Sequence, residues 1–312
     1  KVFDFSKSSN FFLPVLYIKC AESLSPIDAV LLDEGTDLTG HMVWLGCEMM
    51  AQFILTHGDL FKQKQVIELG SGAGLAGLVA AWAARGHPRA PAEGQPAAAS
   101  PTGAGPEGGL VVLTDRDPHV LELLRDNIAQ NAPAMSNLDP HHQHPDTGGQ
   151  KEEAVDKVVH VCSLEWADLD EARSLVDKFT RAGARDGQAP GGGGPDSTQP
   201  SQFTEPDQVE DLKAGFQVVM AADVIYDTSV LGILFKVASC LVAKSGVFLL
   251  AHIPRCAYST IDSLIVQSAM ADGHLECIES FEPSSFVTEG PLLTDLLECS
   301  AKILMFRHKQ PV

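Results

Sequence analysis

A glycine-rich stretch limits what this chain can fold into more than any other feature of its sequence. Residues 66–77 read VIELGSGAGLAG, an apolar run followed by Gly70, Gly72, Gly74 and Gly77. Because glycine has no Cβ, a turn built from it lets a bound ligand approach the backbone closely. The stretch therefore predicts a strand that ends in a ligand-binding turn.

Two classes of cofactor fit this turn. Gly72-Ala-Gly74-Leu-Ala-Gly77 matches the dinucleotide fingerprint G-x-G-x-x-G. Residues 68–74 also match the acid-x-G-x-G-x-G turn of S-adenosylmethionine enzymes, with Glu68 as the acid. Glu68 has no place in the dinucleotide fingerprint, but it can fix the turn and meet a cationic amino group. The sequence also lacks the Tyr-Lys or His-Asp constellation that nicotinamide enzymes often use.

The rest of the chain alternates between apolar strands and helices with one apolar face. We expect strands at residues 65–69, 110–114, 158–162, 216–221, 247–251 and 301–307. Apolar residues recur with helical spacing at residues 75–82, 118–131, 230–242 and 259–271. This alternation predicts an α/β fold in which helices cover both faces of a parallel sheet.

Composition indicates one folded domain with an extension and three insertions. We expect residues 1–39 to form an N-terminal extension that packs on a domain spanning residues 40–312. Stretches rich in Pro, Gly or other small and polar residues lie at about residues 86–109, 132–156 and 180–210. They contain too few large apolar residues to offset the entropy of ordering the chain, so we interpret them as flexible insertions.

Charge and cysteine spacing exclude several classes of protein. The formal net charge is −19, and the chain lacks the clustered Lys and Arg that phosphate binding needs, which argues against a nucleic-acid partner. An acidic surface would instead attract a partner with a basic surface. No apolar run reaches the ~18 residues that a membrane span needs. The seven cysteines are scattered singly, which indicates free thiols in a reducing compartment rather than a metal site.

Polar and aromatic side chains follow the expected strands, where the ligand of a parallel sheet binds. Asp115 follows the second strand and can accept hydrogen bonds from the ribose hydroxyls of an adenosine; Asp117 is better placed to cap the next helix. Trp166 follows the third strand, where its ring can stack on an adenine or pack in the core. Residues 223–226, Asp-Val-Ile-Tyr, follow the fourth strand.

Five motifs in order resemble one family. They are Gly40-His-Met-Val-Trp44, VIELGSGAGLAG, LTDRDPHVLELLRDNIAQN, LEW and AADVIYD. Together they resemble family 16 of the seven-strand class I methyltransferases, which includes the lysine methyltransferases of valosin-containing protein, calmodulin, elongation factors and Hsp70. The resemblance implies a Rossmann-like, mostly parallel seven-stranded sheet and S-adenosylmethionine as cofactor.

The resemblance also implies roles for individual residues. The residues expected at the cofactor are Trp44, Glu68, Gly70, Ser71, Gly72, Gly74, Asp115, Trp166 and Ala222. Asp223 and Tyr226 are expected to be catalytic: Asp223 would capture and orient a cationic side chain, and Tyr226 would form a wall of the target pocket. Trp44 has a second interpretation, as part of the buried face of a helix with Met49, Met50 and Phe53.

The implied activity is transfer of a methyl group to a protein side chain, a lysine ε-amine above all. We expect a monomer that acts in the cytoplasm, with the nucleus as a second compartment, on a protein with a basic surface. Two alternatives stay open, a catalytically silent cofactor-binding module and an NAD-dependent oxidoreductase.

Overall fold

The structure is a computed structural model, and it describes residues 1–5, 15–21, 39–86, 109–136, 158–180, 214–254 and 261–310. The expected insertions, at residues 86–109, 132–156 and 180–210, lie for the most part outside these ranges. So does most of the expected N-terminal extension. The division of the chain into extension, domain and insertions therefore stays a prediction.

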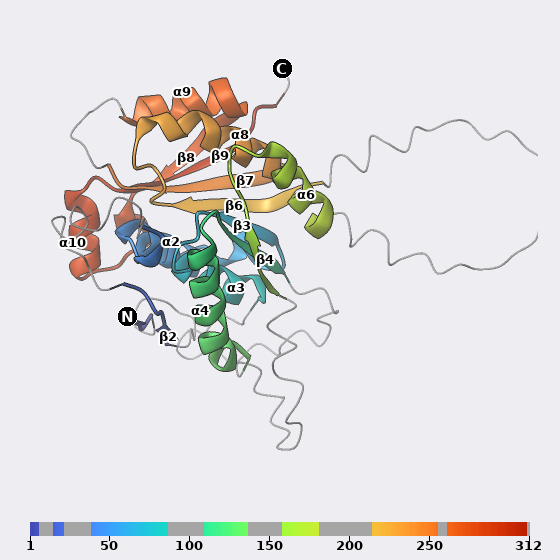
Figure 1. The fold of residues 1–312 in the computed structure, drawn as a ribbon. Coiled ribbons are helices and arrows are strands. Elements are labelled where there is room, and N and C mark those ends of the chain that lie inside the picture. Colours follow the sequence, from blue (N-terminus) through green and yellow to red (C-terminus); the bar gives the residue numbers. More distant parts are fainter. Residues whose placement is uncertain are drawn as a thin grey trace, which may run out of the picture.

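A seven-stranded sheet forms the centre of the described structure (Figure 1). Its order is β5-β4-β3-β6-β7-β9-β8. The strands are β3 (Gln65–Leu69), β4 (Leu110–Asp115), β5 (Val159–Ser163), β6 (Phe216–Ala222), β7 (Val242–His252), β8 (Leu275–Phe281) and β9 (Lys302–His308). β9 runs antiparallel to both of its neighbours, and the other pairings are parallel. The predicted mostly parallel seven-stranded sheet is confirmed.

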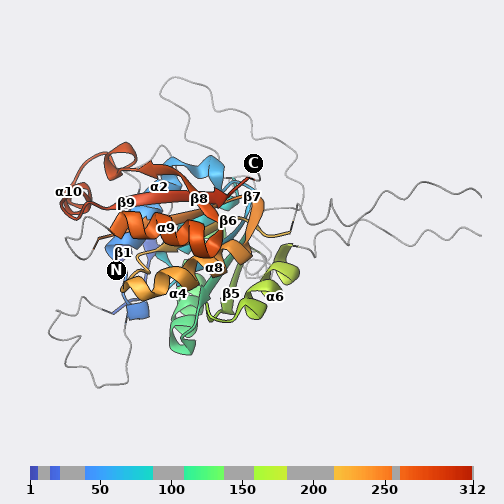
Figure 2. The ribbon, with the colours of Figure 1, turned by 90° about the horizontal axis from the view of Figure 1, so that it is seen from above.

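Helices cover both faces of this sheet, which the view from above also shows (Figure 2). They are α2 (Leu45–Thr56), α3 (Leu75–Ala84), α4 (Pro118–Ser136), α6 (Leu169–Thr180), α8 (Leu231–Leu241), α9 (Ile261–Gly273) and α10 (Pro291–Glu298). Successive strand residues point to opposite faces, so Val66 joins a core with α2, α3 and α4, whereas Ile67 joins a second core with α6, α8 and α9.

Helix α4 is longer than the sequence pattern predicts. It continues to Ser136 instead of ending at Asn131, although Pro133 lies inside it. Met135 explains the extension, because its side chain is only 1% exposed and its carbonyl accepts a hydrogen bond of 2.9 Å from the Arg85 guanidinium. Tertiary contacts thus outweigh the local cost of a proline in the last turns.

Further elements were not predicted. Helices α6 and α10 and strand β8 lie where the sequence analysis assigned no element. Strand β8 lies at the edge of the sheet, so most of its side chains are partly exposed and its apolar pattern is weak. A short antiparallel pair, β1 (Val2–Phe3) with β2 (Leu16–Tyr17), lies near the N-terminus.

Candidate functional site

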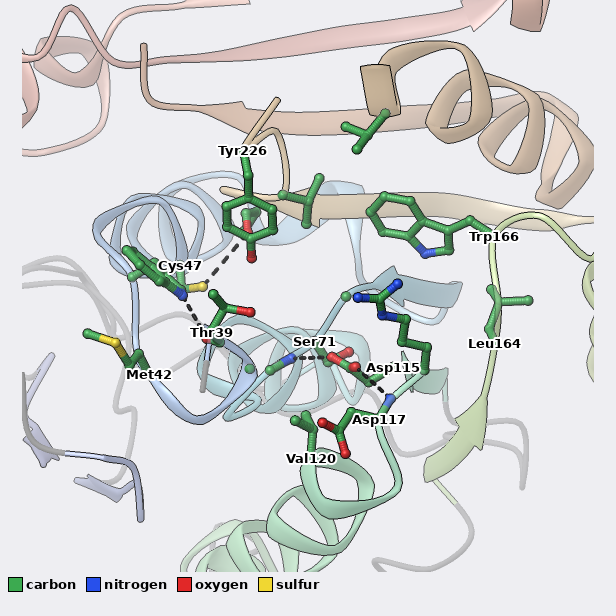
Figure 3. Close-up of a pocket in the computed structure, with 18 of the residues that line it drawn as sticks. Thr39, Met42, Cys47, Ser71, Asp115, Asp117, Val120, Leu164, Trp166 and Tyr226 are labelled. Atoms are coloured by element: carbon green, nitrogen blue, oxygen red, sulfur yellow. Dashed lines mark hydrogen bonds between the residues drawn. The ribbon is translucent and has the colours of Figure 1, made fainter. Parts of the chain in front are cut away.

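A pocket of about 390 Å³ lies where β3, β4, β5 and β6 end (Figure 3). Parallel strands bring their carboxyl ends to one edge of the sheet, and ligands bind there. Eight of the predicted site residues line this pocket: Trp44, Gly70, Ser71, Gly72, Asp115, Trp166, Ala222 and Tyr226. The other three, Glu68, Gly74 and Asp223, do not line it.

The glycine turn after β3 forms the floor of the pocket with its backbone. Gly70, Gly72 and Gly74 have φ angles of 66°, 51° and 86°, a region that side chains disfavour. A Cβ at Gly72 would lie 3.2 Å from the carbonyl oxygen of Gly40, and one at Gly70 would lie 3.1 Å from the side chain of Val224. The turn therefore needs glycine both for its conformation and for the close approach of its neighbours.

The Asp115 carboxyl is tied to this turn. Its Oδ2 accepts a hydrogen bond of 3.2 Å from the Gly72 N–H, and its Oδ1 accepts one of 3.2 Å from the Asp117 N–H. Burial raises the pKa of Asp115, while these backbone donors oppose the rise. Asp117 has the capping geometry that was expected of it, because its Oδ1 accepts a hydrogen bond of 2.8 Å from the His119 N–H.

Glu68 lies behind the turn, not in the pocket. Its side chain is 1% exposed, and a Cβ at Gly77 in helix α3 would lie 2.6 Å from its Oε2. Burial raises the pKa of Glu68 to about 8, a hydrogen bond with the Ser71 hydroxyl opposes the rise, and the charge of Asp115 adds to it. Of the two roles expected for this acid, the position fits fixing the turn and does not fit meeting the amino group of a ligand.

Trp166 follows β5 and faces the turn from the other side of the pocket. A Cβ at Gly70 would lie 3.5 Å from its ring. The ring lines the pocket and also packs against the core between the sheet and α6, so the core interpretation is confirmed and stacking on an adenine stays a prediction. Figure 3 shows the Trp166 ring and the Asp115 carboxyl on different sides of the pocket.

Trp44 and Tyr226 form the opposite end of the pocket. Their ring centroids are 6.3 Å apart with an interplanar angle of 62°, and Tyr226 is 50% exposed. The Trp44 indole donates a hydrogen bond of 2.8 Å to the carbonyl of Thr39, which fixes its orientation. Trp44 is the N-cap residue of α2, so it precedes the buried residues of that helix, which begin at Gly46.

Asp223 is buried at the end of β6 between two residues that line the pocket, Ala222 and Val224. Its φ is +57°, and its N–H donates a hydrogen bond of 3.0 Å to the carbonyl of Ala251. Burial raises the pKa of the Cys47 thiol, which lines the pocket, and the charges of Glu68 and Asp223 raise it further. The Asp223 side chain itself is 5% exposed and does not line the pocket.

Several lining residues were not predicted from the sequence. Thr39 precedes a quoted motif, Met42 lies within it and Cys47 follows it, so their places were within reach of the pattern. Ile233 on helix α8 gave no signal. Within the described ranges, no three His, Cys, Asp or Glu side chains are grouped as metal ligands, and no helix has the length and apolar character of a membrane span.

The sequence of this chain is similar to known methyltransferases. Residues 28–141 match the family model described as lysine methyltransferase. The chain is 26% identical over 228 residues to methyltransferase-like protein 22 of Mus musculus, and this alignment covers 73% of this chain and 42% of that protein. It is 30% identical over 145 residues to protein-lysine N-methyltransferase EEF2KMT of Bos taurus, and this alignment covers 45% of this chain and 36% of that protein.

A third relative is calmodulin-lysine N-methyltransferase of Arabidopsis thaliana, 34% identical over 92 residues, or 30% of this chain and 23% of that protein. The chain thus spans less than half of the length of these relatives. Among solved structures it is similar to Aeropyrum pernix fibrillarin in complex with S-adenosyl-L-methionine, at a TM-score of 0.43 and 11% identity, over 94% of this chain and 88% of that one.

Proposed function

We propose that this chain, whose residues 28–141 match the lysine methyltransferase family model, binds S-adenosylmethionine and transfers its methyl group to a lysine ε-amine of a protein. The observation that carries the proposal is one pocket that joins the glycine turn, Asp115 and Trp166 to Tyr226. The family match covers residues 28–141, which include the turn and Asp115 but not Trp166 or Tyr226. The part of the pocket proposed to bind the target lysine therefore rests on the geometry of the pocket.

The residues of the cofactor half fit an adenosyl group. The turn presents backbone where a Cβ would collide with its neighbours. Asp115 can accept hydrogen bonds from two ribose hydroxyls, and Trp166 offers a ring face on which an adenine can stack. The Asp115 carboxyl is already held by backbone N–H groups, so its position is set before any ligand binds. This pre-organisation reduces the entropic cost of binding.

The chain's part in the chemistry is orientation. S-adenosylmethionine supplies an activated methyl group on a sulfonium, so the protein has to hold the amine in line with it. Free lysine has a pKa of about 10.4, so deprotonation at pH 7 costs roughly 5 kcal/mol. Asp223 captures and orients the ammonium, which loses its proton to water or to a carboxylate as it docks, and the side chains of Trp44, Cys47 and Tyr226 at that end of the pocket favour the neutral amine.

The order of the strands favours this function over the NAD alternative. A dinucleotide-binding sheet of the 3-2-1-4-5-6 type ends in parallel strands, whereas here antiparallel β9 lies between β7 and β8. The catalytically silent module has the same fold, and only an activity measurement separates it from the enzyme.

The test is transfer of label from S-adenosylmethionine carrying a labelled methyl group to proteins in a cell extract. We expect a labelled protein band, and mass spectrometry of that band should place the methyl group on lysine. Label in the low-mass fraction alone would indicate a small-molecule substrate. Absence of label while the cofactor still binds would support the silent module and contradict the proposal.

We further propose a monomer in the cytoplasm and nucleus that acts on a protein with a basic surface and does not bind nucleic acid. The net charge of −19 supports the basic partner. The free thiols at Cys20, Cys47, Cys162, Cys240, Cys277 and Cys299 agree with a reducing compartment. Co-purification of the substrate at low salt, and its loss at high salt, would test the role of charge.

A further inference from the structure

A segment near the N-terminus is linked to the glycine turn at the pocket by one side chain of helix α4, that of Asn127. We call residues 15–21 the N-terminal strap; they include β2, and Leu16 and Ile18 are each 1% exposed. The strap runs along helix α4, and two asparagines of that helix bind its backbone. Neither asparagine had a role in the sequence analysis beyond its place in a motif.

Asn127 binds the strap and the glycine turn at the same time. Its Oδ1 accepts a hydrogen bond of 2.8 Å from the Lys19 N–H, and its Nδ2 donates one of 2.9 Å to the Lys19 carbonyl. The same Nδ2 donates a second hydrogen bond of 2.9 Å to the carbonyl of Ala73, which lies between Gly72 and Gly74. Asn127 is fully buried, so water cannot take over these contacts.

Asn131, one turn further along α4, binds the strap in the same way but does not contact the glycine turn. Its Oδ1 accepts a hydrogen bond of 2.9 Å from the Tyr17 N–H, and its Nδ2 donates one of 2.8 Å to the Tyr17 carbonyl. Its remaining hydrogen bond, of 2.8 Å, goes to the carbonyl of Asn127 within the helix. The two asparagines therefore differ in their link to the turn.

The strap also touches the segment that carries Trp44. The Ala21 N–H donates a hydrogen bond of 2.7 Å to the carbonyl of His41, and Trp44 is bound to the carbonyl of Thr39 in the same short helix. The carbonyl oxygen of Gly40 in that helix faces Gly72, where an added Cβ would lie only 3.2 Å from it. Strap, turn and Trp44 segment thus form one connected backbone assembly around the pocket.

We propose that Asn127 is a positioning residue for the cofactor, because it locks the backbone of the glycine turn to the strap. The amide fixes the carbonyl of Ala73, the residue after Gly72, and the Gly72 N–H donates to the Asp115 carboxyl, so fixing this backbone keeps that N–H aimed at Asp115. The strap is then part of the cofactor site without touching the ligand. This inference rests on the proposed function, since it concerns the same cofactor.

The test compares Asn127→Asp with Asn131→Asp in the full chain, by calorimetric titration with S-adenosylhomocysteine. Each substitution keeps the side-chain size and removes the amide donors, but only the first removes the donor to the turn. We expect Asn127→Asp to weaken binding about 10- to 100-fold, because a buried carbonyl loses its partner. Asn131→Asp should change the affinity less than threefold, although both variants should lower the unfolding temperature. If Asn127→Asp does not fold, Asn127→Ala takes its place.

Enzyme kinetics add a readout that general destabilisation would not produce. In Asn127→Asp the KM for S-adenosylmethionine should rise, while kcat at saturating cofactor and the KM for the protein substrate stay the same. Equal losses of affinity in both variants, or no loss in Asn127→Asp, would overturn the inference. If the unsubstituted chain does not bind S-adenosylhomocysteine, the proposed function and this inference fail together.

Discussion

Asp223 adopts a backbone conformation that few residue types tolerate. Its φ of +57° lies in the left-handed region, where Asp and Asn are enriched because their short polar side chains bond locally. An asparagine at this position keeps both the conformation and the side-chain size. Asp223→Asn therefore tests the charge alone.

We predict that Asp223→Asn lowers methyl transfer about 10- to 100-fold, because the hydrogen bond to a charged ammonium is lost. The affinity for S-adenosylhomocysteine should fall little, since Asp115 and Trp166 still line the cofactor half of the pocket. Asp115→Asn is the matched control, and it should weaken cofactor binding first. Normal transfer by Asp223→Asn would contradict the role given to this carboxylate. Steady-state kinetics and calorimetry on both variants give the comparison.

Gly46, in the first turn of α2, packs directly against Asp223. A Cβ there would lie 2.7 Å from the Cβ of Asp223 and 3.1 Å from its backbone nitrogen. We predict that Gly46→Ala destabilises the fold by about 1–3 kcal/mol through overpacking. Gly232, the second residue of α8, is the control, because a Cβ there would meet the flexible carboxylate of Asp272 at 3.3 Å.

A double-mutant cycle measured by thermal unfolding tests this contact. Asp223→Gly removes the Cβ that Ala at position 46 would meet, so Gly46→Ala should cost much less in that background. An equal cost in both backgrounds would show that the helix and Asp223 are not in the contact described.

Glu68 links stability to pH. Burial raises its pKa from 4.5 to about 8, so between these values the folded chain keeps a proton that the unfolded chain releases. Stability from this group is therefore complete below pH 4.5 and is lost as pH rises towards 8, by up to ~1.4 kcal/mol per pH unit. We predict that Glu68→Gln flattens this part of the stability curve, as measured by urea unfolding at several pH values. Glu122→Gln, at an exposed site, should leave the slope unchanged.

The positions of the motif residues could be predicted because a parallel sheet brings the ends of its strands to one edge. The turn, Asp115, Trp166 and Tyr226 all follow from that rule. The burial of Glu68 could not be predicted, since it depends on how helix α3 packs on the strand.

Among the elements, the prediction was best where strands are apolar and central. β3, β4 and β6 lie in the middle of the sheet, and their apolar runs gave their places within a residue or two. β8 is an edge strand with few buried side chains, so its sequence carries little signal. The length of α4 depends on Met135 and Arg85, a contact that no local pattern contains.

The first expected insertion joins two elements whose described ends meet. A Cβ at Gly109 would lie 2.8 Å from the carbonyl of Ala84, the last residue of α3. A short linker can therefore close this gap. We predict that replacing residues 88–108, which lie outside the described part, by a short Gly-Ser linker leaves the unfolding temperature and cofactor affinity almost unchanged, because loop-closure entropy varies slowly with length. A loss of several kcal/mol in stability would show that the segment packs on the domain.

At the scale of the whole molecule, the fold brings together residues that lie far apart in the chain. Trp44 begins α2, Asp115 ends β4, and Tyr226 follows β6, yet all three line one pocket. The N-terminal strap adds a fourth distant segment, which reaches the turn through Asn127. Sequence patterns located the strand ends, but the link of the strap to the turn needed the three-dimensional structure.

The central claim is that this pocket binds S-adenosylmethionine and not a dinucleotide. Calorimetric titration of the full chain with S-adenosylhomocysteine and, separately, with NAD tests it most directly, with Asp115→Asn as the control for the site. The account predicts saturable binding of S-adenosylhomocysteine that Asp115→Asn weakens, and no binding of NAD. Binding of NAD in the micromolar range, with no response to S-adenosylhomocysteine, would contradict it.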